Sequence, residues 1–266
     1  MKLASKFTRA KQIISGYQSV VVAFSGGQDS ALLLKICALV LAKEKILAVT
    51  AVSASYPQGE LVKAKLLAKQ IGVRLRIIRS AELTNPKFRA NSPRRCYFCK
   101  KELFTKLKII ARKNKLKFVL EASNLSDKLD YRPGNIAKAE LKIKSPLLEA
   151  GFTKNDIQRL SKKLGLSSWN KPSLACLASR IPYGVSISAK LLKRIDRAEI
   201  YLASLGFKQV RLRHHQELCR IEVEKNKIAR LLGMRQEIVA HLKSLGYHYV
   251  TIDLEGYRTG SLNEVI

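Results

Sequence analysis

The first half of the chain alternates short apolar runs with longer segments whose apolar residues recur at helical spacing. Four runs rich in Val, Ile and Leu predict strands, at residues 19–25, 45–54, 73–80 and 117–124. The intervening segments predict helices, at 29–44, 59–72 and 95–114, and a short amphipathic helix precedes the first strand. Strands joined by helices of this length favour a parallel sheet with helices on both faces, an α/β fold.

The order of elements changes after SSWNKPSLACLASRIPYG, a stretch too irregular for a long helix. The pattern beyond it predicts a helix, two strands, a helix and a strand, at 188–206, 207–215, 217–224, 226–246 and 247–256. This order indicates a smaller C-terminal α+β unit. We therefore predict two domains, residues 1–168 and residues 169–266.

The composition suits such a protein, because 266 residues of which 47% are hydrophobic can form a full core. No run approaches the roughly 20 apolar residues that cross a bilayer. The start, MKLASKFTRAKQIISGYQSV, lacks the apolar region of a secretory signal. We expect a cytoplasmic protein with no membrane partner.

The charge is strongly positive, with 50 Lys and Arg against 20 Asp and Glu and a net charge of +30. Such a surface attracts polyanions and would support contact with RNA or DNA. The basic residues are spread through almost every segment, however, and solvated lysine-rich helix faces account for them equally well. Nucleic acid is therefore the less favoured partner.

A sequence typical of phosphate binding, SGGQDS (Ser25 to Ser30), directly follows the first predicted strand and opens a helix. Glycines there allow the backbone to approach a ligand, and the helix N-terminus offers unpaired N–H groups. Ser25 and Ser30 add hydroxyl donors. The lysine of a Walker loop and the third glycine of a dinucleotide fingerprint are both missing.

Three of the five cysteines call for a chemical explanation. Disulfides are not expected in a reducing compartment, and Cys37 and Cys219 lie in segments that predict buried positions. Cys96 and Cys99 form a CxxC pair in RRCYFCKK, and Cys176 lies 77 residues after Cys99. On the residues alone, a zinc site, an iron–sulfur cluster, a dithiol pair and no metal all remain open.

The phosphate loop resembles that of the pyrophosphatase-loop (PP-loop) ATPases, whose motif is matched by Ser25, Gly26, Gly27, Asp29 and Ser30. Four further stretches are similar to the LarE family of ATP-dependent sulfur transferases. These are residues 123–134, 171–184, 211–215 and 253–264. The resemblance runs from about residue 5 to the C-terminus and implies an adenine nucleotide alpha hydrolase-like fold.

The resemblance also implies an activity. Family members adenylate the carboxylates of pyridinium-3,5-biscarboxylic acid mononucleotide with ATP and Mg²⁺, and convert them to thiocarboxylates for the nickel-pincer nucleotide cofactor of lactate racemase. The three cysteines Cys96, Cys99 and Cys176 correspond to members thought to hold a [4Fe–4S] cluster, to which sulfide or a sulfur carrier brings sulfur. Members with the third cysteine alone surrender its own sulfur, and this sacrificial use of Cys176 is the alternative.

The same resemblance implies roles for several other residues. Arg211 and Arg213 alternate along one strand, so they face the same side, and are expected to bind the nucleotide phosphate, with Arg180 in the same pocket. Glu199 and Glu222 match positions linked with metal or assembly. His214 and His215 form a strand-end pair that we interpret as structural. The resemblance implies a homo-oligomer, with a hexamer as one candidate.

Three rival functions remain open. A tRNA thiolase of the PP-loop and [4Fe–4S] type would suit the positive charge, although no separate RNA-binding domain or additional CxxC pair is evident. An ATP-dependent amidating enzyme would need ammonia and no cysteines. A non-enzymatic nucleic-acid-binding module would leave the phosphate loop without a purpose.

Overall fold

A computed structural model describes residues 2–129, 132–172, 175–258 and 260–264. The chain forms two compact units. The first comprises Met1–Ser53, Gln58–Glu82 and Arg94–Leu174, and the second comprises Ala54–Pro57, Leu83–Pro93 and Ala175–Ile266. The predicted division at residue 168 does not anticipate the two short segments of the first half that belong to the second unit.

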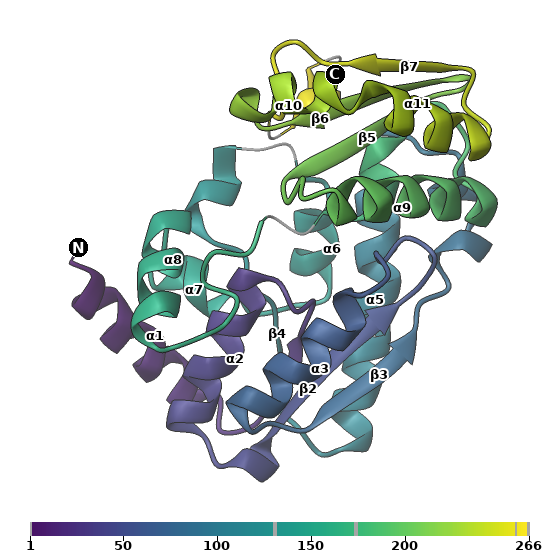
Figure 1. The fold of residues 1–266 in the computed structure, drawn as a ribbon. Helices are drawn as coiled ribbons and strands as arrows, with labels where there is room; N and C mark the ends of the chain where they lie inside the picture. The colour runs from purple at the N-terminus through teal and green to yellow at the C-terminus, as the bar shows by residue number, and fades with distance from the viewer. Residues whose placement is uncertain (1, 130–131, 173–174, 259, 265–266) are drawn as a thin grey trace. The chain divides into compact units, whose positions relative to one another are not determined.

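A parallel four-stranded sheet in the order β3-β2-β1-β4 forms the centre of the first unit. Its strands are β1 (Val20–Ala23), β2 (Ile46–Val52), β3 (Leu75–Arg79) and β4 (Phe118–Leu120). Its helices are α1 (Leu3–Gly16), α2 (Gln28–Val40), α3 (Glu60–Ile71), α5 (Arg95–Lys113), α6 (Gly134–Glu140), α7 (Pro146–Glu149) and α8 (Lys154–Lys163) (Figure 1). The predicted α/β fold is confirmed.

Helices cover both faces of this sheet because successive strand residues point to opposite sides. Val20 and Val22 belong to a core that also holds residues of α1, α2, α3 and α8. Val21, between them, belongs to a second core that holds residues of α5 and α6. A strand buried on both sides reads as a continuous apolar run, as VVVA does in β1.

The second unit contains a three-stranded mixed sheet in the order β5-β6-β7. Strands β5 (Val210–His215) and β6 (Leu218–Val223) are antiparallel, whereas β6 and β7 (Tyr249–Ile252) are parallel. Its helices are α4 (Pro86–Arg89), the short 3-10 helix η4 (Leu177–Arg180), α9 (Ala189–Ser204), α10 (Ile228–Gly233) and α11 (Arg235–Ser244). The smaller α+β unit is therefore also confirmed.

The predicted single helix over 226–246 is two helices, α10 and α11. The break falls after Gly233, at Met234, which has non-helical dihedral angles of −100° and 15°. After proline, glycine has the highest free-energy cost in a helix interior, so ending the helix at Gly233 loses little stability. Apolar spacing alone does not detect it, because the pattern continues on both sides.

The two cysteines predicted to be structural, Cys37 in α2 and Cys219 in β6, are buried. Burial raises the pKa of both thiols, that of Cys219 to about 12. Within the described part of the chain, no helix has both the length and the apolar character needed to span a membrane. Asp130, Tyr131, Ser173, Leu174 and Thr259, which belong to the stretches that resemble the LarE family, lie outside the described residues.

Candidate functional site

The phosphate loop, Ser25 to Ser30, lies at the carboxyl end of β1. The chain places β2 and β3 on one side of β1 and β4 on the other, so this end is the point where the strand order reverses. Ligands of open α/β sheets bind at such switch points. The strand end is held by Phe24, whose N–H donates to the oxygen of Val49 and whose oxygen accepts from the Thr50 hydroxyl at 2.7 Å.

Gly26 gives the loop a shape that other residues adopt poorly. Its φ is +72°, and a Cβ atom there would lie 2.8 Å from the Cβ and 3.1 Å from the Cα of Ala64 in α3. The close approach of the loop to α3 therefore needs glycine on two grounds, conformation and space. Gly27 follows as the N-cap of α2 in extended conformation.

The two serines of the motif hold the loop together. Their hydroxyl oxygens are 3.2 Å apart, the Ser25 hydroxyl accepts from the N–H of Gly27 at 3.3 Å, and the Ser30 hydroxyl donates to the oxygen of Gly27 at 3.0 Å. The loop is thus preorganised around the first turn of α2. Its hydroxyls and the helix N-terminus offer donors to an anion.

Asp29, the carboxylate of the motif, is paired with Lys154 at 2.6 Å. Burial raises the pKa of Asp29 and the charge of Lys154 opposes this shift. Lys154 is the first residue of α8, so the ion pair joins the first turns of α2 and α8. Sequence reasoning missed Lys154, because nothing in the spacing of FTKNDIQ relates it to the phosphate loop.

Lys171 is a second cation at the loop that sequence reasoning did not assign. Its ammonium donates to the oxygen of Gly26 at 3.0 Å and to the carboxylate of Glu60 in α3. Gln28 also donates to the oxygen of Trp169. Residues 169–171 therefore pack on the phosphate loop. The only signal was the position of Lys171 at the start of a stretch similar to the LarE family.

Cys96 and Cys99 lie in the first turns of α5, three residues apart and so on neighbouring positions of one helix face. Cys96 is exposed and Cys99 is partly buried. Between them Tyr97 is buried, and its hydroxyl lies 3.1 Å from both carboxylate oxygens of Glu140 in α6. This contact fixes the cysteine turn to α6.

Gly134, at the start of α6, lies close to the same turn. A Cβ atom there would lie 2.9 Å from Cγ of Lys100 and 3.6 Å from the oxygen of Cys96. The backbone of α6 therefore packs directly against the cysteine turn.

Cys176 belongs to the second unit, is exposed and precedes η4. Its neighbours are fixed through the main chain, since the N–H of Leu177 donates to the oxygen of Ser55 at 2.9 Å. Arg180 donates from Nη1 to the oxygens of Ala175 and Cys176 at 3.0 and 3.2 Å. The thiol is thus presented by a backbone that is held on both sides.

Two of the arginines predicted to bind substrate pair with the two glutamates singled out in the sequence. Arg180 is bound by Glu199, and Arg213 by Glu222, each through two hydrogen bonds from Nε and Nη2. Arg213 also donates to the Ser261 hydroxyl. Both pairs are almost fully buried. Their substrate-binding role stays a prediction, and their observed contacts are internal.

Arg211 is the third predicted arginine. It is buried, with its guanidinium 5.2 Å from the ring centre of Tyr257 and Nη1 donating to the oxygen of Val210 at 2.7 Å. Burial lowers the pKa of Arg211, and the positive charge of Arg180 lowers it further. The negative charge of Glu199, the partner of Arg180, acts in the opposite direction.

His214 and His215 follow on the same strand. Burial lowers the pKa of both, that of His214 to about 4. The His214 ring lies 5.9 Å from that of Tyr247. These surroundings suit a neutral packed imidazole.

In the described ranges, no three side chains of His, Cys, Asp and Glu lie together as metal ligands would. Cys96 and Cys99 belong to one unit and Cys176 to the other. The donor type fits an iron–sulfur cluster, because all three are cysteines and two share one helical turn. Ligation by all three stays a prediction.

Comparisons with known proteins place this chain in a family. The NAD synthase family model matches residues 2–115, a range that contains the phosphate loop and Cys96 and Cys99. The pyridinium-3,5-bisthiocarboxylic acid mononucleotide synthase of Lactiplantibacillus plantarum is 37% identical over 264 residues, which cover 99% of this chain and 96% of that protein. This chain belongs to the LarE family.

Two further relatives carry no functional name. An uncharacterized protein of Synechocystis is 40% identical over 266 residues, 99% of each chain. An uncharacterized protein of Methanocaldococcus jannaschii is 29% identical over 243 residues, 91% of this chain and 92% of its own. The similarity to the LarE protein therefore extends through both units, beyond the range of the NAD synthase model.

Proposed function

We propose that this LarE-family chain adenylates the carboxylates of pyridinium-3,5-biscarboxylic acid mononucleotide with ATP and converts them to thiocarboxylates. The observation that supports this most directly is the phosphate loop at the switch point of the sheet. Gly26 allows the close approach, and Ser25, Ser30 and the first turn of α2 supply donors for the phosphates. We place the activity in the cytoplasm, where cysteines stay reduced.

A carboxylate oxygen is a poor leaving group, so the carboxylate must be activated before sulfur can replace that oxygen. A carboxylate oxygen of the substrate attacks the α-phosphorus of ATP, which releases pyrophosphate and forms an acyl adenylate. Hydrosulfide then attacks the acyl carbon, AMP leaves with the electron pair of the broken C–O bond, and the sulfur loses its proton to solvent. Each carboxylate therefore consumes one ATP and one hydrosulfide.

The residues of the phosphate loop divide these tasks. The loop and α2 bind the phosphates, and Asp29 would hold the Mg²⁺ that accompanies ATP. Lys154 and Lys171, adjacent to Asp29 and Gly26, supply positive charge to the pyrophosphate that leaves. None of these groups needs to donate or accept a proton.

Sulfur delivery is proposed to depend on Cys96, Cys99 and Cys176 as ligands of a [4Fe–4S] cluster. A cluster held by these three thiols would supply the hydrosulfide that attacks the acyl adenylate. Cys96 and Cys99 both lie near the N-terminus of α5, so one helical turn would supply two of the three ligands. The proposal requires that the two units bring their thiols together in the working enzyme.

The nucleotide phosphate of the substrate is assigned to the buried arginines of the second unit. Arg180 and Arg213 are oriented by Glu199 and Glu222, and we propose that they shape the site. Arg211, with a pKa lowered by burial and by Arg180, would gain most from a bound phosphate. We also propose that the protein forms a homo-oligomer, with a hexamer as candidate. Light scattering measures its molar mass in solution.

The test uses protein reconstituted anaerobically with iron and sulfide, then given substrate, MgATP and sulfide. We expect AMP and pyrophosphate, a product with sulfur in place of oxygen, and many turnovers per protein. Cys96→Ala, Cys99→Ala and Cys176→Ala should each lose the visible cluster absorption and the turnover, whereas Cys219→Ala, a buried cysteine outside the set, should keep both.

Three results would overturn the proposal. Turnover limited to one sulfur per protein, with loss of the Cys176 sulfur, would establish sacrificial transfer. Turnover that needs tRNA in place of the mononucleotide would establish a tRNA thiolase. Turnover that uses ammonia in place of sulfide would establish an amidating enzyme.

A further inference from the structure

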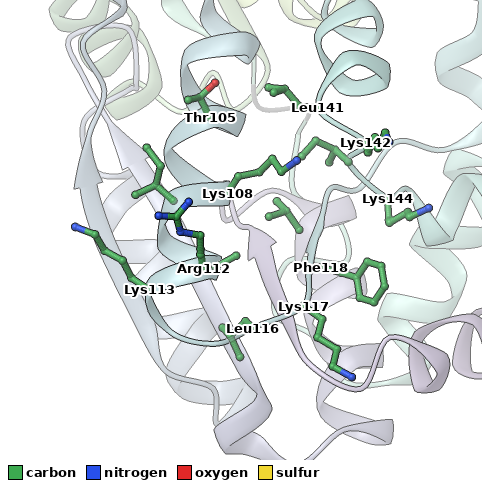
Figure 2. A pocket seen from close by; sticks show the side chains of 14 residues that line it. Thr105, Lys108, Arg112, Lys113, Leu116, Lys117, Phe118, Leu141, Lys142 and Lys144 are labelled. Atoms are coloured by element: carbon green, nitrogen blue, oxygen red, sulfur yellow. The ribbon is translucent and has the colours of Figure 1, made fainter.

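A hollow in the first unit lies apart from the phosphate loop. Its volume is about 790 Å³, within the usual range of ligand sites (Figure 2). Three segments line it: the C-terminal half of α5, the residues that lead into and begin β4, and residues 141–144 after α6. We call this hollow the basic groove.

The lining of the basic groove is strongly cationic. Six of its side chains carry positive charge: Lys108, Arg112, Lys113, Lys117, Lys142 and Lys144. No Asp or Glu of the described residues lines it. Among the ion pairs of the described residues, none involves these six side chains. Their charge is not neutralised inside this part of the protein.

The two walls and the floor of the groove differ in character. Lys108, Arg112 and Lys113 come from α5, and Lys142 and Lys144 come from the segment on the other side (Figure 2). The apolar side chains form the floor: Ile109 is exposed, Phe118 and Leu141 are partly buried, and Leu116, Val119 and Ile143 are buried. The ligand that fits must therefore combine negative charge with flat, weakly polar surface.

The groove lies at the end of the sheet opposite to the phosphate loop. Val20, the first residue of β1, pairs with Phe118, the first residue of β4, and the two strands are parallel. The phosphate loop follows the carboxyl end of β1, whereas the groove is built at the amino end of β4. The basic groove is therefore separate from the phosphate loop, and a ligand in the groove does not block that loop.

We propose that the basic groove binds single-stranded nucleic acid, with phosphates along the two cationic walls and base faces on the apolar floor. A charged chain of phosphates matches six uncompensated cations better than a mononucleotide does, and the net charge of +30 favours a polyanion throughout. A flat membrane surface cannot reach a recessed floor. A duplex keeps its base faces stacked and cannot use that floor either.

The test measures binding of a fluorescent single-stranded RNA oligonucleotide by anisotropy over a series of KCl concentrations. The variant Lys108→Gln/Lys113→Gln/Lys142→Gln removes cations from both walls, and these side chains are exposed, so folding should be preserved. The control Lys45→Gln/Lys65→Gln/Lys69→Gln removes the same charge from exposed positions elsewhere on the unit. Thermal denaturation of each variant checks the fold.

We expect the slope of log Kd against log salt to fall by about 2 in the groove variant, at about 0.7 per lost phosphate contact. The control should keep the wild-type slope, and MgATP should not compete with the RNA. Equal losses in the groove variant and the control would overturn the proposal, since only overall charge would then matter. Full competition by AMP, tighter binding of duplex, or binding of anionic vesicles without RNA binding would overturn it as well.

Discussion

Arg180 and Glu199 form a buried two-bond ion pair in which Nε and Nη2 each donate to one carboxylate oxygen at 2.8 Å. The remaining nitrogen, Nη1, donates to the oxygens of Ala175 and Cys176, and Glu199 also accepts from the N–H of Leu212 at 2.9 Å. One guanidinium thus connects α9 and β5 to the main chain of the proposed sulfur-handling cysteine. The position of Cys176 depends on this connection.

We predict that Arg180→Lys reduces the rate of sulfuration at least about tenfold, because an ammonium cannot bind both carboxylate oxygens and the Cys176 backbone together. Formation of AMP and pyrophosphate should fall less, since the phosphate loop is unchanged. Steady-state assays of both products measure this difference. Arg197→Lys, at an exposed position of α9, the helix that carries Glu199, is the matched control. Equal loss of both activities would contradict a positioning role.

Gly26→Ala tests the shape of the phosphate loop. The new Cβ would lie 2.8 Å from that of Ala64 at a φ of +72°, so the loop must shift and the variant should lose about 1–3 kcal/mol of unfolding free energy. ATP turnover should be lost with it. Chemical denaturation and pyrophosphate release measure the two effects.

Gly16→Ala is the control for this substitution. A Cβ at Gly16, the last residue of α1, meets no atom within 4 Å, so we expect an unchanged or slightly higher stability. A Gly26→Ala protein with wild-type stability and activity would show that the loop tolerates the shift.

The fold could be predicted because the spacing of apolar residues identifies the buried strands and the helices that cover them. VVVA and ILAVTAV are buried on both sides, and a continuous apolar run between helical segments is specific for a parallel sheet. The break between α10 and α11 could not be predicted in this way, because Gly233 interrupts a helix without interrupting its apolar spacing.

The site was predicted only where a local motif encodes it. SGGQDS is a contiguous loop, so Ser25, Gly26, Gly27, Asp29 and Ser30 are fixed together by one strand and one helix. Lys154 and Lys171 reach the same loop from distant parts of the chain, and only packing brings them there. The glutamate partners of Arg180 and Arg213 likewise depend on the pairing of separate elements.

Lys171→Gln should raise the KM for ATP several-fold with a smaller change in stability. Lys171 holds the oxygen of Gly26 and lies beside Glu60, whose pKa is lowered by Lys171 and Lys63 against the effect of burial. Its loss removes positive charge at the loop. Initial rates over a range of ATP concentrations measure the KM. Lys162→Gln removes a charge that lies over the Trp169 ring and should leave the KM unchanged; an equal rise in both variants would contradict a specific role.

Acid should destabilise the second unit through His214. Burial lowers the pKa of this imidazole to about 4, and the charges of Arg194 and His215 act in the same direction. The unfolded chain, with a histidine pKa of about 6.5, therefore binds more protons between pH 6.5 and pH 4. The unfolding free energy must fall as the pH is lowered through this range, by on the order of 2–3 kcal/mol for this one group.

His214→Phe removes the titration and keeps an aromatic ring beside Tyr247. In the described part of the chain, Nδ1 of His214 has no hydrogen-bond partner, so the substitution leaves no partner of that atom unsatisfied. We expect a flatter pH dependence between pH 6.5 and pH 4, measured by urea denaturation at a series of pH values. Leu254→Ala, which changes an exposed apolar side chain of the same unit, should retain the wild-type slope. A His214→Phe protein with that same slope would mean that His214 is protonated in the folded state and that its imidazole can reach water.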